Sequence, residues 1–495
     1  MKKYAAMMLA LCLMLVASGA LAFSITGLET ESVSREWETN FFFKRMSQLT
    51  GIETSAAATY TEKDYTKLLA GMEKGEITVD ALFKANLTRE QETALLDCGA
   101  IVDLAPYIEE NMPNLSALLS ENPEWRGVIT LKDGRIPSLP LINEAERQIC
   151  VWINKAWLDT LGLSMPQNTE ELTQALLAFK TRDPNGNYKE DEVAADMLGV
   201  YEMRWLLPYF SVIADDYHLA RNSQGEYVFA PEQEGYREFV ALLKEWNELG
   251  LFDEEAFTSA HNAASLETSD DEVVTSGLIV TVAPYTSVPA ANSINYVPLL
   301  IDGPDGSIRW RDALGAVWTG CFAVTSACDD PAQALRWADA LYTEAGAILA
   351  YAGVEGDEYS FGENGRWVFN VDMMRTIDDI RGDSIIYTGV PTPGISPSDF
   401  LAKVESEIDI HILGCMNDVR AVSEQVSPAY LLDSDAQARA KEIAAVLGRL
   451  VDEGIGRFAT GETEMTDDNW NAWLESLRDA GSEELTQLFN AAIAK

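Results

Sequence analysis

Short apolar segments alternate with amphipathic helical patterns along most of this chain, and this alternation restricts its fold more than any other feature. An apolar segment at 24–28 is followed by a helical pattern that ends before Gly51. Further on, the strand-like residues 77–83 lie between helical patterns at 65–72 and 88–96. Strands separated by helices favour βαβ units with a mainly parallel sheet. We therefore expect an α/β protein.

Pairs of extended segments indicate that the chain passes between two lobes more than once. Apolar runs lie close together at 136–142 and 148–153, and further extended runs follow at 296–301 and 316–325. Two lobes joined in this way place a ligand cleft between them. The prediction assigns 1–22 to a signal peptide, 23–145 to lobe 1, 146–295 to lobe 2, 296–390 to a return into lobe 1, and 391–495 to a hinge crossing and the helical C-terminal part of lobe 2.

Residues 1–22 have the features of a secretory signal peptide. Lys2 and Lys3 precede an apolar stretch that ends with Ala20 and Ala22 in a small-x-small pattern. An uncleaved signal anchor is the alternative. A lipid anchor would need a cysteine at the end of this stretch, whereas Cys12 lies in its middle. We therefore expect an exported protein, extracellular or periplasmic, with no lipid-attachment cysteine evident.

The charge balance argues against two classes of partner. The chain has 79 acidic and 36 basic residues, which gives a formal net charge of −43. Nucleic acid is excluded because contacts to phosphates need a basic face. Anionic membrane surfaces are disfavoured for the same reason. We expect a monomer whose acidic surface keeps it in solution.

Common catalytic motifs are not found in the sequence. The three histidines, His218, His261 and His411, have no zinc-ligand spacing, and neither a nucleophile elbow nor a phosphate-binding glycine loop occurs. The first hypothesis is therefore a binding protein without enzymatic activity. The alternative is an exported carbohydrate-active hydrolase that uses two of the many carboxylates.

The most specific motif is an acidic loop at 183–192. Asp183, Asn185 and Asn187 stand at positions 1, 3 and 5, so that alternate oxygens turn toward one cation. Lys189 offers its backbone carbonyl at position 7, and Asp191 and Glu192 close the site with two carboxylates. Oxygen ligands with three negative charges suit Ca²⁺, which takes six to eight of them. We predict a structural calcium ion here.

The loop also departs from the common calcium-binding signature. Position 6 is Tyr188 rather than glycine, and position 12 is Ala194 rather than glutamate. The alternative is a solvated turn, because Asp183, Pro184, Asn185 and Gly186 all favour turns.

Several blocks together resemble a known family, the extracellular solute-binding proteins of ABC importers, carbohydrate-type family 1. The first block is Trp152–Leu163 with Pro166 and Thr169–Leu172, and later blocks lie at 331–339 and 353–359. The loop 183–192 resembles the calcium loop of the subgroup that includes alginate-oligosaccharide binders. The resemblance implies a two-lobed, periplasmic-binding-protein-like fold. It also implies capture of a small ligand, an oligosaccharide, for delivery to ABC permease membrane subunits.

The ligand-binding residues are chosen by their position near strand ends, because sugars stack on aromatic faces and bond to polar side chains. For each of them the alternative is an ordinary core or surface residue. The predicted ligand-binding residues are Trp37, Phe83, Lys84, Trp205, Tyr209, Tyr285 and Trp318.

Overall fold

The computed structural model describes residues 22–493 except 31–36, 60, 145–147, 254–255, 258–272, 313–315, 364, 387, 398–402, 404–406 and 428–430. The predicted signal peptide, apart from its last residue Ala22, therefore lies outside the described residues. In the described part of the chain, no helix combines the length and the apolar character that a membrane span requires.

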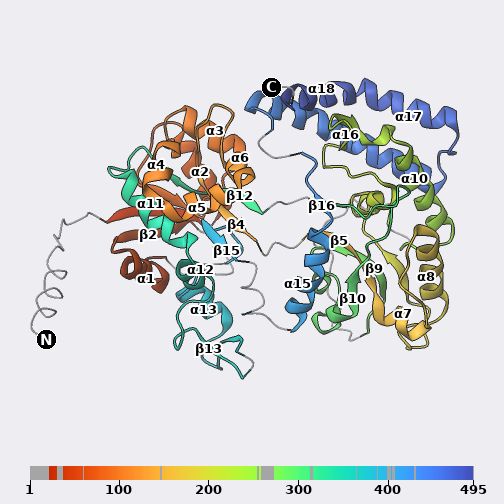
Figure 1. The fold of residues 1–495 in the computed structure, drawn as a ribbon, viewed down its shortest axis with the longest axis horizontal. Coiled ribbons are helices and arrows are strands. Elements are labelled where there is room, and N and C mark those ends of the chain that lie inside the picture. The colour runs from red at the N-terminus through yellow and green to blue at the C-terminus, as the bar shows by residue number, and fades with distance from the viewer. Residues whose placement is uncertain are drawn as a thin grey trace, which may run out of the picture. The chain divides into compact units, whose positions relative to one another are not determined.

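The chain divides into two compact units (Figure 1). Lobe 1 contains the chain up to Glu144 and Val317–Pro397, and lobe 2 contains Ala145–Ala316 and Ser398–Lys495. The prediction returns the chain to lobe 1 at residue 296, whereas residues 296–316 remain in lobe 2 because β10 (Tyr296–Pro298) pairs with β5 (Cys150–Asn154). The predicted crossing at 391 also comes too early, because β15 (Gly394–Ser396) still pairs with β4 of lobe 1.

Lobe 1 is built on a six-stranded sheet in the order β15-β4-β12-β3-β1-β2. Its other strands are β1 (Phe23–Leu28), β2 (Thr54–Thr59), β3 (Ala81–Phe83), β4 (Leu139–Asn143) and β12 (Val317–Val324). Strand β12 runs antiparallel to both of its neighbours, while the remaining pairs are parallel. Five of the six strands of this sheet therefore run in the same direction, so the predicted mainly parallel sheet is confirmed and β12 is the reversed strand. Strand β4 ends where the chain leaves lobe 1 and β12 begins where it returns, so the two must run in opposite directions.

Helices cover this sheet and bury an aromatic core. Helix α1 begins after Asn40, whose side chain accepts from the Phe42 amide at 2.8 Å. The core includes Trp37, Phe83 and Trp337. The helices of lobe 1 are α1 (Phe41–Thr50), α2 (Glu62–Met72), α3 (Arg89–Asp97), α4 (Ala105–Asn111), α5 (Pro113–Glu121), α6 (Pro123–Ile129), α11 (Pro331–Asp339), α12 (Glu344–Tyr351) and α13 (Ile377–Asp383). A two-stranded ribbon is formed by β13 (Tyr359–Phe361) and β14 (Trp367–Phe369).

Lobe 2 has a smaller sheet in the order β10-β5-β9-β6. Strand β9 (Ser276–Thr281) is antiparallel to β5 and parallel to β6 (Val193–Asp196). The predicted helices after β5 are confirmed as α7 (Lys155–Leu161) and α8 (Thr169–Thr181), and Asn168 caps the latter through the Glu171 amide.

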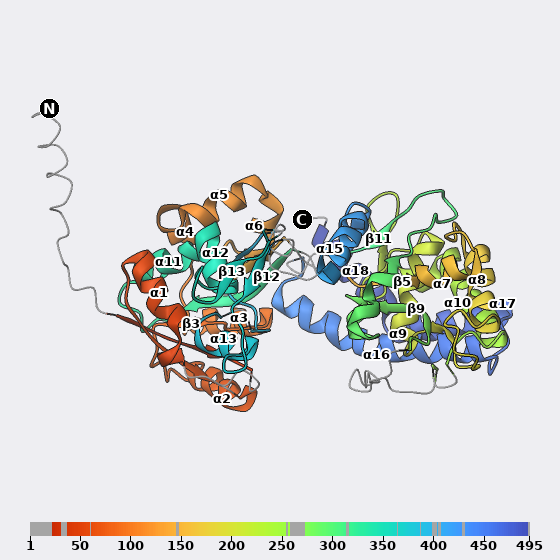
Figure 2. The same cartoon turned by 90° about the horizontal axis from the view of Figure 1, so that it is seen from below.

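The remaining elements of lobe 2 are helical or short ribbons. The long helix α16 packs against α10 and α18, as Figure 2 also shows. The mainly helical C-terminal region is therefore confirmed. The helices are α9 (Val200–Met203), α10 (Glu234–Glu248), α15 (Glu407–Arg420), α16 (Ser434–Thr460), α17 (Asp467–Asp479) and α18 (Ser482–Ile493). In one short ribbon β7 (Leu219–Arg221) pairs with β8 (Tyr227–Phe229), and in another β11 (Trp310–Arg311) pairs with β16 (Ser423–Glu424).

A bulge interrupts the pairing of β12 with β4. Trp318 pairs with Leu141 and Phe322 pairs with Leu139, so residues 319–321 lie opposite Pro140. Proline has no N–H to give to the ladder, and a bulge accommodates it. Gly320 has φ +76°, and a Cβ there would lie 2.1 Å from the Leu87 carbonyl oxygen. Only glycine fits this position without displacing backbone.

Gly320→Ala should destabilise lobe 1 more than Gly99→Ala does. Both glycines have nearly the same φ, +76° and +77°, but a Cβ at Gly99 meets nothing within 4 Å. The clash should therefore cost about 1–3 kcal/mol beyond the backbone strain that both variants share. Urea unfolding followed by tryptophan fluorescence measures the difference. Equal losses in the two variants would contradict the tight packing at the bulge.

Candidate functional site

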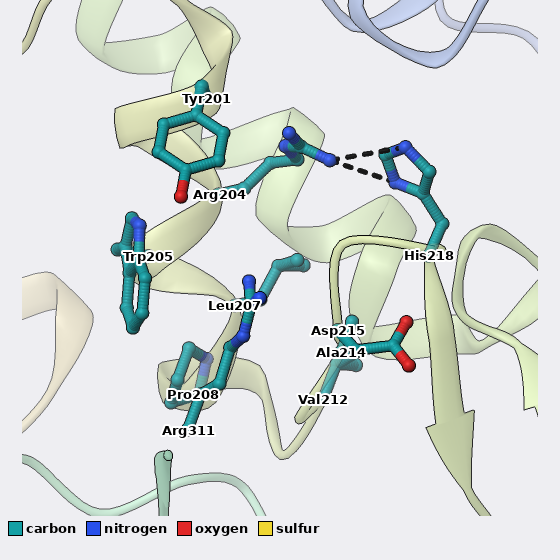
Figure 3. A pocket seen from close by; sticks show the side chains of 10 residues that line it. All are labelled: Tyr201, Arg204, Trp205, Leu207, Pro208, Val212, Ala214, Asp215, His218 and Arg311. Carbon is teal, nitrogen blue, oxygen red and sulfur yellow. Dashed lines mark hydrogen bonds between the residues drawn. The ribbon is translucent and has the colours of Figure 1, made fainter. Parts of the chain in front are cut away.

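A pocket lies within lobe 2, where the chain leaves β6 and passes through α9 and the 3₁₀ helix Arg204–Phe210 (Figure 3). A volume of about 380 Å³ here includes the gaps between side chains and open solvent, and the part that a water molecule can enter is about 20 Å³. Arg311 reaches it from a distant segment. The residues that line the pocket are Tyr201, Arg204, Trp205, Leu207, Pro208, Val212, Ala214, Asp215, His218 and Arg311.

Two arginines lie over two aromatic rings in this pocket. The Arg204 guanidinium is 5.3 Å from the ring centroid of Tyr201, and the Arg311 guanidinium is 5.1 Å from that of Trp205. Arg311 also pairs with the exposed Asp216 at 2.8 Å. Such stacking fixes the planar guanidinium groups, because the ring face attracts a cation. The pocket therefore presents rigid N–H donors beside ring surfaces.

Asp215 supplies the carboxylate of the pocket wall. Its Oδ1 accepts from the Tyr217 and Leu219 amides at 2.9 Å each, and Oδ2 accepts from the Ser427 hydroxyl. Burial nevertheless raises the pKa of Asp215 to about 6, because desolvation outweighs these hydrogen bonds. The group is therefore ionised at neutral pH and becomes protonated in mild acid.

Arg204 also contacts a histidine and an aspartate. Its Nη1 lies 3.0 Å from Nδ1 and 3.2 Å from Nε2 of His218 (Figure 3). Burial lowers the pKa of His218, and the nearby arginines lower it further, so the ring is neutral. On its other side, Arg204 Nε lies 3.8 Å from Asp452 Oδ1, and neither atom has a hydrogen-bond partner within the described chain. Arg204 is thus held in place with unused donor capacity.

Two of the predicted ligand-binding residues belong to this region. Trp205 lines the pocket. Tyr209 lies in the same 3₁₀ helix, where it is buried against Trp310 and its hydroxyl donates to the Leu299 carbonyl at 2.7 Å. Tyr209 therefore supports the wall of the pocket.

Three predicted ligand-binding residues have packing roles in lobe 1 instead. Trp37 and Phe83 lie 5.6 Å apart in the aromatic core, where other rings cover them. Lys84 is 0% exposed, and its Nζ lies 2.6 Å from Glu29 Oε2 and also bonds to the Thr388 hydroxyl. A position next to a strand end suggested ligand contact, but these side chains point into the lobe.

Tyr285 and Trp318 are half-buried, and they lie in different lobes. Tyr285 follows β9 of lobe 2, and Trp318 precedes the bulge in β12 of lobe 1. Both remain predictions as ligand-binding residues.

The loop 183–192 joins α8 to β6 in lobe 2. All five side chains predicted to bind the cation are half-buried, whereas Gly186 and residues 188–190 between them are exposed. Asp183 accepts from the Asn187 amide at 3.1 Å and from the Tyr188 amide at 3.0 Å. Tyr188 has φ 61°, so it takes the left-handed conformation for which glycine usually stands at this position.

Glu192 carries the clearest sign of an incomplete oxygen cluster. Its Oε1 is buried and has no hydrogen-bond partner among the described residues. Burial raises the pKa of Glu192, and the nearby Asp191 and Asp183 charges raise it further. Within the described ranges, no three His, Cys, Asp or Glu side chains are grouped as a metal site. The residues fit a hard cation only with the asparagine amides and a backbone carbonyl added to the carboxylates.

Comparisons with known proteins agree with this architecture. No family model matches the chain. The fructooligosaccharide ABC transporter substrate-binding protein FusA of Streptococcus pneumoniae serotype 4 (strain ATCC BAA-334 / TIGR4) is 28% identical over 319 residues, which is 62% of this chain and 56% of FusA. The lipoprotein LipO of Bacillus subtilis (strain 168) is 30% identical over 95 residues, 19% of this chain and 17% of LipO. The chain thus aligns with about half of the length of FusA and with a smaller part of LipO.

Solved structures match over nearly the whole chain. FusA in complex with kestose superposes with a TM-score of 0.70 at 21% identity, covering 95% of this chain and 98% of that structure. An HMO-binding solute-binding protein from Bifidobacterium longum infantis ATCC 15697 gives 0.79 at 18% identity, with coverage of 95% and 98%. The alginate-binding protein AlgQ2 without calcium ion gives 0.65 at 18%, with coverage of 96% and 98%.

The fold is that of the substrate-binding proteins of ABC transporters. The predicted two-lobed α/β architecture is therefore confirmed. Of these proteins, FusA and the HMO-binding protein are named as carbohydrate-binding proteins of ABC transporters, which agrees with the predicted resemblance.

Sequence reasoning missed Tyr201, Arg204, Asp215 and Arg311 in the pocket. The dense aromatic and charged segment 201–218 was a usable signal. Arg311 was not predictable, because only the fold brings it to Trp205.

Asp215→Asn should change how the stability of lobe 2 depends on pH. A carboxyl whose folded pKa is raised binds more protons in the folded state, so its contribution falls as the pH rises from about 4 to about 6. Asparagine does not titrate, so the difference in unfolding free energy between wild type and variant should change by up to about 3 kcal/mol across this window. Thermal or urea unfolding at several pH values measures it. Parallel curves for the two proteins would contradict the raised pKa.

Proposed function

We propose that this protein is an exported solute-binding protein that captures an oligosaccharide for an ABC-type importer. The observation that carries the proposal is the likeness to FusA, which is 28% identical over 319 residues and whose fold, solved in complex with kestose, this chain shares. The protein would act as a monomer and deliver the ligand to the membrane subunits of the permease.

The chemistry of the pocket suits a neutral polyol. The C–H faces of a sugar ring can stack on the half-exposed Tyr201, while hydroxyl groups accept from the arginines. Arg204 and Arg311 are held by their rings and acidic partners, so little side-chain freedom is lost on binding.

Binding is favoured over the hydrolase alternative. A typical glycosidase places two carboxyl groups on either side of the scissile bond. Among the described residues that line the pocket, Asp215 is the one carboxylate, and both of its oxygens accept hydrogen bonds from the protein. The relatives FusA and the HMO-binding protein are also named as substrate-binding proteins.

Tyr201→Ala and Arg311→Gln should each weaken oligosaccharide binding about tenfold, because each removes a ring face or a charged donor from the pocket. Isothermal titration calorimetry with kestose, fructo-nystose and other neutral oligosaccharides measures this. Phe41→Ala, an aromatic of similar exposure in lobe 1, should leave affinity unchanged.

Two results would contradict the proposal. One is the absence of binding to any oligosaccharide by the unaltered protein. The other is the appearance of shorter sugars when the protein and oligosaccharide are incubated and analysed by chromatography.

We also propose that the loop 183–192 binds a structural Ca²⁺. Asp183, Asn185, Asn187, Asp191 and Glu192 would supply side-chain oxygens, and Lys189 its backbone carbonyl. Support comes from the partnerless Glu192 Oε1 and from the charges of Asp191 and Asp183, which act on the same carboxyl. Asn187 donates from Nδ2 to Asp191 at 3.0 and 2.9 Å, so its amide would turn its oxygen inward on binding. The ion would hold the α8–β6 connection in place.

Ca²⁺ should raise the melting temperature of lobe 2 relative to EDTA-treated protein. A ligand at 100 times its dissociation constant stabilises the folded state by about 2.7 kcal/mol. Glu192→Gln should remove most of this gain, whereas Glu190→Gln should retain it because Glu190 is exposed. Differential scanning calorimetry provides the test, and identical melting curves with Ca²⁺ and EDTA would refute the site.

A further inference from the structure

Three buried polar atoms of lobe 2 lie together beside the pocket, and none of them has a partner in the described protein. They are Nε of Arg204 in the 3₁₀ helix, the hydroxyl of Tyr236 in α10 and Oδ1 of Asp452 in α16. We call this group the buried cluster. A polar atom that is removed from water without a new partner destabilises the fold, so each of the three requires an explanation.

Helix packing brings these atoms together. Helix α10 packs against both the 3₁₀ helix and α16. Arg204 Nε lies 3.8 Å from Asp452 Oδ1. Gly448 stands one turn before Asp452 on the same face of α16, and a Cβ there would lie 3.8 Å from Nε2 of His218. This face of α16 is therefore turned toward the pocket wall.

Tyr236 is 0% exposed, and both charges of the buried cluster act on its hydroxyl. Burial raises the pKa of Tyr236, the charge of Arg204 lowers it, and the charge of Asp452 raises it. The hydroxyl therefore lies within electrostatic reach of both groups. Its ring packs edge-on against Phe239 with centroids 5.7 Å apart, which fixes the side chain in this place.

The chemistry of the buried cluster selects a small neutral occupant with both donors and acceptors. The charges of Arg204 and Asp452 are opposite, so neither a cation nor an anion is favoured. A separation of 3.8 Å is too long for a direct hydrogen bond, but one water molecule can bridge it. Water can accept from Arg204 Nε–H, donate to Asp452 Oδ1 and accept from the Tyr236 hydroxyl. Three partners are also what a buried water commonly has.

We propose that one buried water molecule joins Arg204, Tyr236 and Asp452 and holds the Arg204 side chain in the pocket wall. Tyr236 and Asp452 are then positioning residues, because they act through Arg204 and are not among the described residues that line the pocket. His218 contacts Arg204 Nη1 at 3.0 and 3.2 Å (Figure 3). With Nε and Nη1 both engaged, Nη2 keeps its donors for a ligand. This role in ligand capture rests on the proposed function.

A crystal structure at a resolution that shows ordered water tests the proposal without any ligand. We expect one water within about 3.2 Å of all three atoms of the buried cluster. A direct hydrogen bond between Arg204 and Asp452 would overturn the proposal, and so would the lack of a water that contacts all three.

NMR of the full chain, labelled at its arginine nitrogens, gives a readout specific to Arg204. The Nε–H signal is assigned by its loss in Arg204→Lys. Tyr236→Phe should raise the rate at which this proton exchanges with solvent about tenfold, because the water loses one of its three partners. The matched control is Glu453→Gln, at the exposed neighbour of Asp452 on α16, which should leave the rate unchanged. Equal rates in Tyr236→Phe and the unaltered protein would contradict the proposal.

Calorimetry with the oligosaccharide panel, on the same proteins, separates this proposal from the proposed function. Tyr236→Phe should weaken sugar binding about threefold, because Arg204 is less well pre-organised, and Glu453→Gln should not weaken it. If the water is present but Tyr236→Phe binds sugar as tightly as the unaltered protein, the positioning role is refuted. If the unaltered protein binds no oligosaccharide, the proposed function fails, and the crystal and NMR results still decide whether a water holds Arg204.

Discussion

Strand β12 joins the two halves of the lobe 1 sheet. It pairs with β3 on one side and with β4 on the other, so without it the six strands would separate into two groups. Its bulge is equally constrained. The Gly320 amide donates to the Ser138 hydroxyl at 2.8 Å, the Ser138 hydroxyl donates to Glu92, and the Leu87 amide donates to the Gly320 carbonyl at 3.0 Å. Burial raises the pKa of Glu92, while the charge of Arg89 acts in the opposite direction.

The pocket of lobe 2 also depends on segments that lie far apart in the chain. The wall of its pocket is formed by the segment 201–218, but Arg311 and Ser427 come from parts of the chain that follow much later. Asp452 of α16 faces Arg204 from a third segment. The polar groups of the pocket are therefore positioned only when both portions of lobe 2 have packed together.

The loop 183–192 combines attraction and repulsion between its own polar groups. The Asn185 and Asn187 amides donate to Asp191, whereas the charges of Asp191 and Asp183 raise the pKa of Glu192. A bound cation would relieve the repulsion between the carboxylates, and an arrangement of this kind suits a small hard ligand.

The sequence by itself determined the α/β class, the helices around Thr169–Thr181 and the spacing of the loop oxygens. These features depend on local periodicity, capping by Asn168 and the alternation of residues along a short turn. The tertiary structure alone decided the direction of β12, the crossing at Val317 and the burial of Lys84 against Glu29. It also brought Arg311 to Trp205. These features join residues far apart in the chain, and local sequence patterns carry no information about which distant side chains will meet.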